Sequence, residues 1–215
     1  MADSLQSILD ARKAQWAKKA PDSTKKVYDE GIADVVKQGV LAKAKQLGDQ
    51  APDFSLSNAT GQSVRLAALL QEGPVILTWY RGGWCPYCNL TLRRLQDELP
   101  RFQAAGAKLI ALTPELPDKS LSTQEKHELS FEVLSDLHNE VAKAYGVVFS
   151  LTPEVAEMYQ NAFDLHGYNG DQSNELPLAA TYVIDRAGTI RYAFLDAEYR
   201  HRAEPDDIIQ VLEQL

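Results

Sequence analysis

The chain has 215 residues, of which 45% are hydrophobic and 24% are charged, a composition typical of one globular domain with or without an appendage. Its formal net charge of −8 at pH 7 argues against a nucleic-acid partner, because nucleic acids select basic surfaces. No apolar run approaches the ~20 residues needed to span a bilayer. The first residues have neither the basic start nor the apolar core of a signal peptide. We therefore expect a cytoplasmic protein with no membrane partner.

The N-terminal part of the chain predicts two helices. Apolar side chains recur at helical spacing over residues 5–16 and again over residues 27–36, and residues 21–23 interrupt the pattern. These helices could pack on their own domain or form the contact of a homodimer. We expect a helical extension over residues 1–47 and one domain over residues 48–215.

Strands and helices alternate from residue 48 onward. The turn-rich residues 58–61 predict a hairpin, and β-branched and aromatic content predicts buried strands over residues 74–80 and 108–113. Residues 122–125 resemble a capping box, which predicts a helix from there to about residue 129. A short strand at residues 131–134 should follow.

The C-terminal third continues the alternation of strands and helices but ends in two consecutive strands and a helix. We expect a helix over residues 139–145, a second helix capped by Thr152, and a loop over residues 166–175. Residues 180–195 predict two strands around a tight turn, and a last helix follows from Glu204. Alternation followed by an antiparallel hairpin predicts an α/β fold with a mixed sheet and helices on both faces.

The two cysteines of the sequence, Cys85 and Cys88, lie three positions apart between a predicted strand and a predicted helix. The partial positive charge of a helix N-terminus stabilises a thiolate. In a reducing cytosol such a pair is more often catalytic, redox-sensing or metal-binding than structural. A zinc site would need two further ligands, and the four histidines lack zinc spacing, so we expect neither a metal nor another cofactor.

Five segments in the correct order resemble the peroxiredoxin-like branch of the AhpC/TSA family: residues 48–54, 80–88, 133–136, 145–147 and 182–188. The resemblance covers residues 48 to about 212 and excludes the N-terminal helices. It implies a thioredoxin-like fold and an antioxidant thiol peroxidase that reduces hydrogen peroxide or organic hydroperoxides. It also implies a redox-active disulfide and recharging by thioredoxin or another small dithiol.

The cysteine motif fits two family templates that name different nucleophiles. Counted from Tyr80, the peroxiredoxin pattern places its Pro at Arg81, its Thr at Cys85 and its attacking cysteine at Cys88. In the thioredoxin pattern, a cysteine that follows a tryptophan attacks first, which here is Cys85 after Trp84. Both templates fit equally well.

A second difference from the family pattern concerns the residue just before the strand predicted to start at residue 180. Many peroxiredoxins have an arginine there that polarises the peroxide, and thioredoxin-like reductases have a cis-proline. The corresponding residue here is Ala179. Pro177 lies two positions earlier, where it could approach Cys85 through a shifted loop or be an ordinary loop proline.

The first cysteine of such a pair generally faces solvent, so we expect Cys85 to attack and Cys88 to resolve the oxidised sulfur into a disulfide. Arg81 is the candidate for the missing cation, with a surface arginine as the alternative. The segment 200–202 is basic and could be a solvated loop or an anion-binding element.

Four neighbours of the cysteines are candidates for the substrate pocket. Gly83, together with Gly82, permits an unusual backbone at the end of the strand, and Pro86 suits the first turn of the helix. Trp84 and Tyr87 should wall the pocket, although plain core packing is an alternative for Tyr87.

Two other functions remain alternatives to a peroxidase. One is a thiol–disulfide oxidoreductase of the thioredoxin type, which the Cys-x-x-Cys register and Ala179 favour. The other is a non-enzymatic redox sensor, which would oxidise Cys85 and Cys88 reversibly without turnover.

Overall fold

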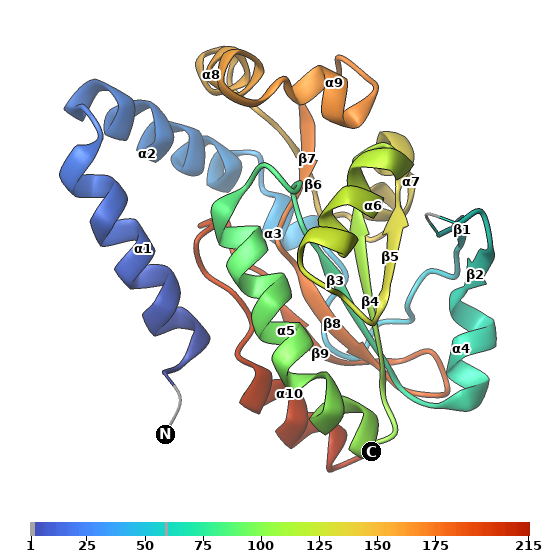
Figure 1. Cartoon of the computed structure of the whole chain (residues 1–215). Coiled ribbons are helices and arrows are strands. Elements are labelled where there is room, and N and C mark those ends of the chain that lie inside the picture. The colour runs from blue at the N-terminus through green and yellow to red at the C-terminus, as the bar shows by residue number, and fades with distance from the viewer. Residues whose placement is uncertain (1–2, 59) are drawn as a thin grey trace.

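A five-stranded mixed sheet forms the centre of the computed structural model, which describes residues 3–58 and 60–215 (Figure 1). Its strands lie in the order β5 (Glu132–Ser135), β4 (Lys108–Thr113), β3 (Val75–Trp79), β8 (Thr181–Ile184), β9 (Ile190–Phe194). The first three strands are parallel, whereas β8 pairs antiparallel with both β3 and β9. The predicted mixed sheet and its C-terminal hairpin are confirmed.

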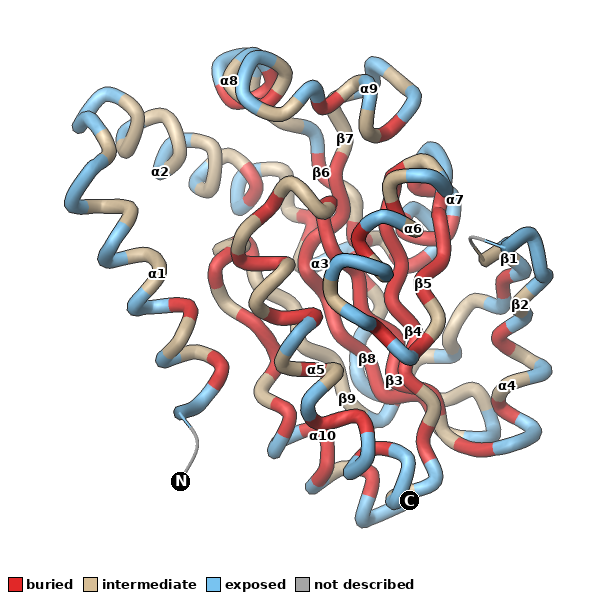
Figure 2. The backbone as a smooth tube through the Cα atoms, viewed as in Figure 1, coloured by how far each residue is buried: buried red, intermediate tan, exposed pale blue. Residues whose placement is uncertain are grey.

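Both faces of the sheet are covered, which explains why its strands read as continuous apolar runs. Side chains alternate along β3, so Ile76 belongs to one hydrophobic cluster while Val75 and Leu77 belong to the other. The Ile76 face packs against α5 (Pro86–Ala104) and α10 (Pro205–Leu212). Figure 2 shows the buried residues concentrated on the central strands and on the helix sides that face them.

The remaining elements surround this core. They are α3 (Val40–Lys43), β1 (Ser55–Ser57), β2 (Ser63–Arg65), α4 (Leu66–Glu72), α6 (Pro117–Lys126), η1 (Leu137–Asn139), α7 (Glu140–Ala144), β6 (Val148–Ser150), α8 (Pro153–Phe163), α9 (Leu165–Asn169) and β7 (Glu175–Pro177). β1 and β2 form the predicted hairpin, and Thr152 caps α8 as predicted. None of the helices in the described ranges is long and apolar enough to cross a bilayer.

The N-terminal helices α1 (Leu5–Lys19) and α2 (Asp22–Lys37) pack on their own chain, α1 against α5 and α2 against α8. Leu5 and Leu9 are completely buried in the cluster that also contains both cysteines. The Glu204 carboxylate accepts hydrogen bonds from the backbone N–H groups of Leu5 (3.0 Å) and Gln6 (2.7 Å). These bonds satisfy donors that the first turn of a helix leaves without partners.

Two local predictions were wrong. Helix α6 begins at Pro117, five residues before the apparent capping box, so residues 122–125 lie inside the helix. Proline suits the first helical position because its missing N–H would have no partner there, and Asp118 complements the positive helix end. The predicted loop at residues 166–175 contains most of α9 and the start of β7. β7 pairs with β6, and strands this short carry too little periodicity to be predicted from sequence.

Candidate active site

The cysteine pair lies at the start of α5, directly after the loop that leaves β3. Cys85 is the N-cap residue of α5, Pro86 is in the first turn, and Cys88 follows within that turn. Both side chains are buried, with 1% and 0% of their surfaces exposed. The expectation that Cys85 faces bulk solvent was therefore wrong: aromatic side chains cover it.

Cys85 instead lines a pocket of about 330 Å³, and Cys88 does not. The predicted Trp84, Pro86 and Tyr87 all line this pocket with Cys85. Arg81, the predicted cation, also lines it from the loop after β3. The rest of the wall was not predicted and comes from α1, α2, α8 and the segment after β9: Arg12, Trp16, Tyr28, Tyr159, Phe163 and Tyr199. A larger hollow of about 840 Å³ lies near the C-terminus and is lined by neither cysteine.

The two glycines before the cysteines serve different purposes. Gly82 has φ 153°, and a Cβ there would meet the Trp84 ring at 2.1 Å. Gly83 does not line the pocket of Cys85. Its N–H donates a 2.8 Å hydrogen bond to Glu115, and a Cβ would meet Thr123 at 2.2 Å. The close approach of these groups requires glycine at both positions.

Arg81 is buried, with 3% of its surface exposed, so the alternative of a surface arginine was wrong. Its guanidinium carbon lies 4.1 Å from the centroid of the Tyr199 ring and 5.2 Å from that of Trp84. Nη2 also donates a 3.0 Å hydrogen bond to the Tyr159 hydroxyl. The electron-rich ring faces offset part of the cost of burying this cation.

A second arginine lies beside Cys88. Nη2 of Arg202 is 3.5 Å from the Cys88 sulfur. Nη1 donates to the backbone oxygens of His201 (2.6 Å) and Tyr199, which fixes the side chain. The sequence left residues 200–202 open as an anion-binding element, but no local signal placed Arg202 against a residue 114 positions earlier.

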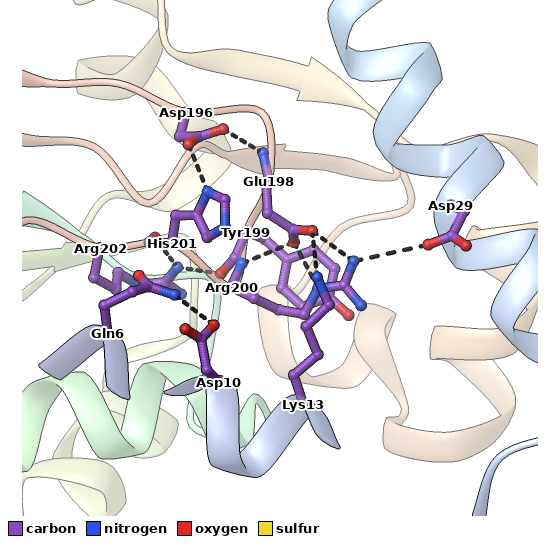
Figure 3. Close-up of polar contacts among 10 residues, drawn as sticks. All are labelled: Gln6, Asp10, Lys13, Asp29, Asp196, Glu198, Tyr199, Arg200, His201 and Arg202. Atoms are coloured by element: carbon purple, nitrogen blue, oxygen red, sulfur yellow. Dashed lines mark hydrogen bonds and ion pairs between the residues drawn. The ribbon is translucent and has the colours of Figure 1, made fainter. Parts of the chain in front are cut away.

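The segment from Asp196 to Arg202 is held by its own charged groups and by the N-terminal helices (Figure 3). Arg200 pairs with Glu198 at 2.6 Å, and Glu198 also lies 3.6 Å from Lys13 on α1. The His201 ring lies 2.8 Å from the Asp196 carboxylate. Arg200 and Arg202 are both buried, so the interpretation of residues 200–202 as a solvated loop was wrong.

The surroundings of the two thiols shift their pKa values in opposite directions. Burial by itself raises the pKa of Cys85, but a hydrogen bond with Cys88 and the positive charges of Arg81 and Arg202 outweigh it and bring the pKa well below its ordinary value. Burial raises the pKa of Cys88, and its hydrogen bond with Cys85 and the Cys85 charge raise it further. The pair therefore favours a thiolate at Cys85 and a thiol at Cys88.

Glu115 is a further buried group near the pair, with no exposed surface. Burial raises its pKa to about 7, although the hydrogen bond that the Gly83 N–H donates to its carboxylate lowers that pKa. Sequence reasoning missed this residue. Its position just beyond the carboxyl end of β4 was a usable signal, because sites in α/β sheets gather at such ends.

Neither Pro177 nor Ala179, the two candidates before β8, lines the pocket. Pro177 ends β7 and pairs with Val148, so it is not a loop proline. Peptide bonds across residues 3–58 and 60–215 are trans. Cations near the thiols come instead from Arg81 and Arg202.

Comparison with known proteins agrees with this architecture. The AhpC/TSA family model matches residues 47–193. "Peroxiredoxin Q, chloroplastic" of Populus jackii is 24% identical over 180 residues, covering 84% of this chain and 73% of its own length. Peroxidoxin BcpB from Mycobacterium tuberculosis has a TM-score of 0.62 at 22% identity, covering 79% of this chain and 97% of its own. A peroxiredoxin-like protein from Aquifex aeolicus has a TM-score of 0.63 at 16% identity, covering 80% and 88%.

Proposed function

This chain belongs to the AhpC/TSA family as a peroxiredoxin-like thiol peroxidase, and on that premise we propose that Cys85 attacks the hydroperoxide and Cys88 resolves the product. The observation that carries this assignment is the difference between the two sulfurs. Cys85 lines the pocket and is favoured as a thiolate, whereas Cys88 lies outside the pocket and is favoured as a thiol.

The first step uses the Cys85 thiolate and the Arg81 cation. The thiolate attacks the distal oxygen of ROOH, so an S–O bond forms and the O–O bond breaks. The sulfur is oxidised by two electrons to a sulfenic acid, and the released RO⁻ takes a proton from water to become ROH. Arg81 Nε–H is buried without a partner among the described residues, which leaves a donor for the developing negative charge.

The second step joins the two sulfurs. Cys88 loses its proton, and its sulfur attacks the sulfur of Cys85. An S–S bond forms, the S–O bond breaks, and the leaving hydroxide combines with a proton to give water. The Arg202 guanidinium beside Cys88 supports the negative charge that this sulfur must carry before it attacks.

A dithiol reductant completes the cycle. Thioredoxin or a similar dithiol exchanges with the Cys85–Cys88 disulfide and becomes oxidised while both cysteines return to thiols. Disulfide exchange alone would not need an unpartnered buried donor on a residue that lines the same pocket as the attacking sulfur. The Arg81 Nε–H therefore favours peroxide over a protein disulfide as the oxidising substrate.

The test compares the two candidate oxidants on the same protein. With thioredoxin, thioredoxin reductase and NADPH present, we expect peroxide-dependent NADPH oxidation by the wild-type protein. Insulin reduction by the reduced protein should remain far slower. Rapid insulin reduction without peroxide turnover would instead support a thiol–disulfide oxidoreductase. Reversible oxidation without turnover of either substrate would support a redox sensor.

A further inference from the structure

The pocket above Cys85 is lined by rings and partly built by the N-terminal helices. We propose that it selects hydroperoxides carrying a bulky apolar group over hydrogen peroxide, and that Trp16 and Tyr28 set this preference. This inference rests on the proposed peroxidase function and names the substrate class of the same site.

The chemistry of the pocket wall matches an apolar group. Seven of its eleven lining residues are aromatic, and its two charged residues, Arg12 and Arg81, are both basic. Aromatic walls bind aryl and branched alkyl groups through apolar burial and ring contacts. Hydrogen peroxide has no apolar surface and gains nothing from these contacts.

The size of the pocket points the same way. Its volume is about 330 Å³, whereas a water molecule occupies about 30 Å³ in the liquid. Hydrogen peroxide is comparable to two waters and would leave most of the pocket unfilled. Pockets of about 300 Å³ and above are of the size that holds small organic ligands.

Part of the pocket wall comes from outside the matched family region. Trp16 of α1 and Tyr28 of α2 contact each other edge to face, with ring centroids 5.4 Å apart. Tyr28 continues this wall to Tyr159 at 5.9 Å and Tyr199 at 6.4 Å. The family model begins at residue 47, so the two helices add a wall to the pocket that the matched region does not contain.

The position of Cys85 assigns an orientation to the substrate. The O–O bond must be aligned with the Cys85 sulfur for attack, so the remainder of ROOH must lie along the rest of the pocket wall. That wall includes Trp16 of α1 and Tyr28 of α2, which the apolar group would contact. Only the apolar group would contact the N-terminal helices, so changes there should alter selectivity more than chemistry.

The experiment measures kcat/KM for cumene hydroperoxide, tert-butyl hydroperoxide and hydrogen peroxide with saturating reductant. For the wild-type protein we expect values that increase with the size of the apolar group. Trp16→Ala should lower the ratio of the cumene hydroperoxide value to the hydrogen peroxide value about tenfold, because one ring contact is lost. Trp16→Phe should retain most of the ratio. Gln15→Ala, on the exposed side of the same helix, is the matched control and should leave the ratio unchanged.

Each outcome has a defined meaning. A wild-type preference for hydrogen peroxide, or an unchanged ratio in Trp16→Ala, would overturn the inference while leaving the peroxidase function in place. Failure of the folded wild-type protein to turn over any of the three peroxides would overturn the peroxidase function and the inference together. Thermal melting of each variant identifies undocking of α1. If Trp16→Ala undocks, the wild-type size series still decides between the outcomes.

Discussion

Cys85 and Cys88 are one helical turn apart, yet the two regions around them differ in access and charge. The Cys85 region is a ring-lined pocket with Arg81 in its wall. Cys88 does not line this pocket and is packed in the hydrophobic core, with Arg202 against its sulfur and the buried Glu115 nearby. Exposure does not distinguish the thiols, since 1% and 0% of their surfaces are accessible. A pocket and the placement of two cations can therefore differentiate chemically identical side chains.

The comparison also explains why two family templates fitted one motif. Aligning the motif with the peroxiredoxin or the thioredoxin template uses residue spacing alone, and both alignments place the attacking cysteine at the start of the helix. The difference arises from residues that reach the pair from elsewhere in the chain, such as Tyr159 beside Arg81 and Arg202 beside Cys88. We therefore expect substitutions in the Cys85 region and in the Cys88 region to affect different steps of the reaction.

The largest expected effect is on the nucleophile. Cys85→Ser should reduce peroxide turnover by at least about 10³-fold, because a hydroxyl cannot replace the thiolate. Cys88→Ser should still react once and retain a sulfenic acid on Cys85, since the resolving thiol is missing. Dimedone labelling after one equivalent of peroxide, followed by mass spectrometry, identifies the oxidised residue. Labelling of Cys88 in the Cys85→Ser protein would reverse the assignment of the two cysteines.

Glu115 tests the Cys88 region through stability. Its pKa is about 7 in the folded protein and about 4.3 in an unfolded chain. The folded state thus binds the proton more tightly, and this stabilisation, complete below about pH 4, is lost as pH rises through about 7. Relative to Glu115→Gln, the wild-type protein should lose up to about 3 kcal/mol between these limits. Urea denaturation at several pH values measures this difference.

The control for Glu115 is Glu157→Gln on the exposed side of α8, which should show the wild-type pH dependence. The glutamine at position 115 can still accept the Gly83 hydrogen bond, so the loop before Cys85 should be retained. Parallel pH profiles of the wild-type and Glu115→Gln proteins would contradict a raised pKa at this site.

Arg81 tests the Cys85 region through chemistry. Arg81→Met keeps the length of the side chain but removes the cation that lowers the pKa of Cys85, so that pKa should rise. The rate of sulfenic acid formation at pH 7 should fall about 10²-fold through loss of thiolate and of one donor to the leaving oxygen. Thiolate absorbance at 240 nm against pH, and stopped-flow peroxide reduction, measure the two effects.

An exposed arginine provides the control for Arg81. Arg65→Met, on the hairpin strand β2, removes a cation that is 63% exposed and should change neither measurement. An unchanged thiolate titration in Arg81→Met would show that the Arg81 cation does not lower the pKa of Cys85.

The smallest expected effect is on the resolving step. Arg202→Met removes the cation next to Cys88, so the pKa of Cys88 should rise further and its thiolate become rarer. Disulfide formation after oxidation of Cys85 should slow about tenfold, corresponding to about 1.4 kcal/mol. Attack on peroxide should slow less than in Arg81→Met, because Arg81 is the larger of the two charge effects on Cys85. A larger loss in the first step than in the second would show that the two arginines do not divide their roles by region.

Several features could be predicted from sequence because their causes are local. Apolar strands over residues 74–80 and 108–113, the start of α8 at Thr152 and the hairpin around residues 185–189 follow from periodicity, capping and turn chemistry. The Cys85–Cys88 pair was identified from its spacing and its position at a strand–helix junction, and Arg81 from its closeness to the pair in sequence. Local signals failed at α6, where Pro117 started the helix before the apparent cap.

By itself, then, the sequence determined the α/β alternation, the position of the dithiol and its family. Only the tertiary structure decided that Arg81 is buried among rings, that Arg202 reaches Cys88 and that Trp16 lines the pocket. The physical reason is that these contacts join residues as far as 114 positions apart, and no local periodicity encodes them. Packing of α1 and of the segment after β9 brings these side chains to the cysteine pair.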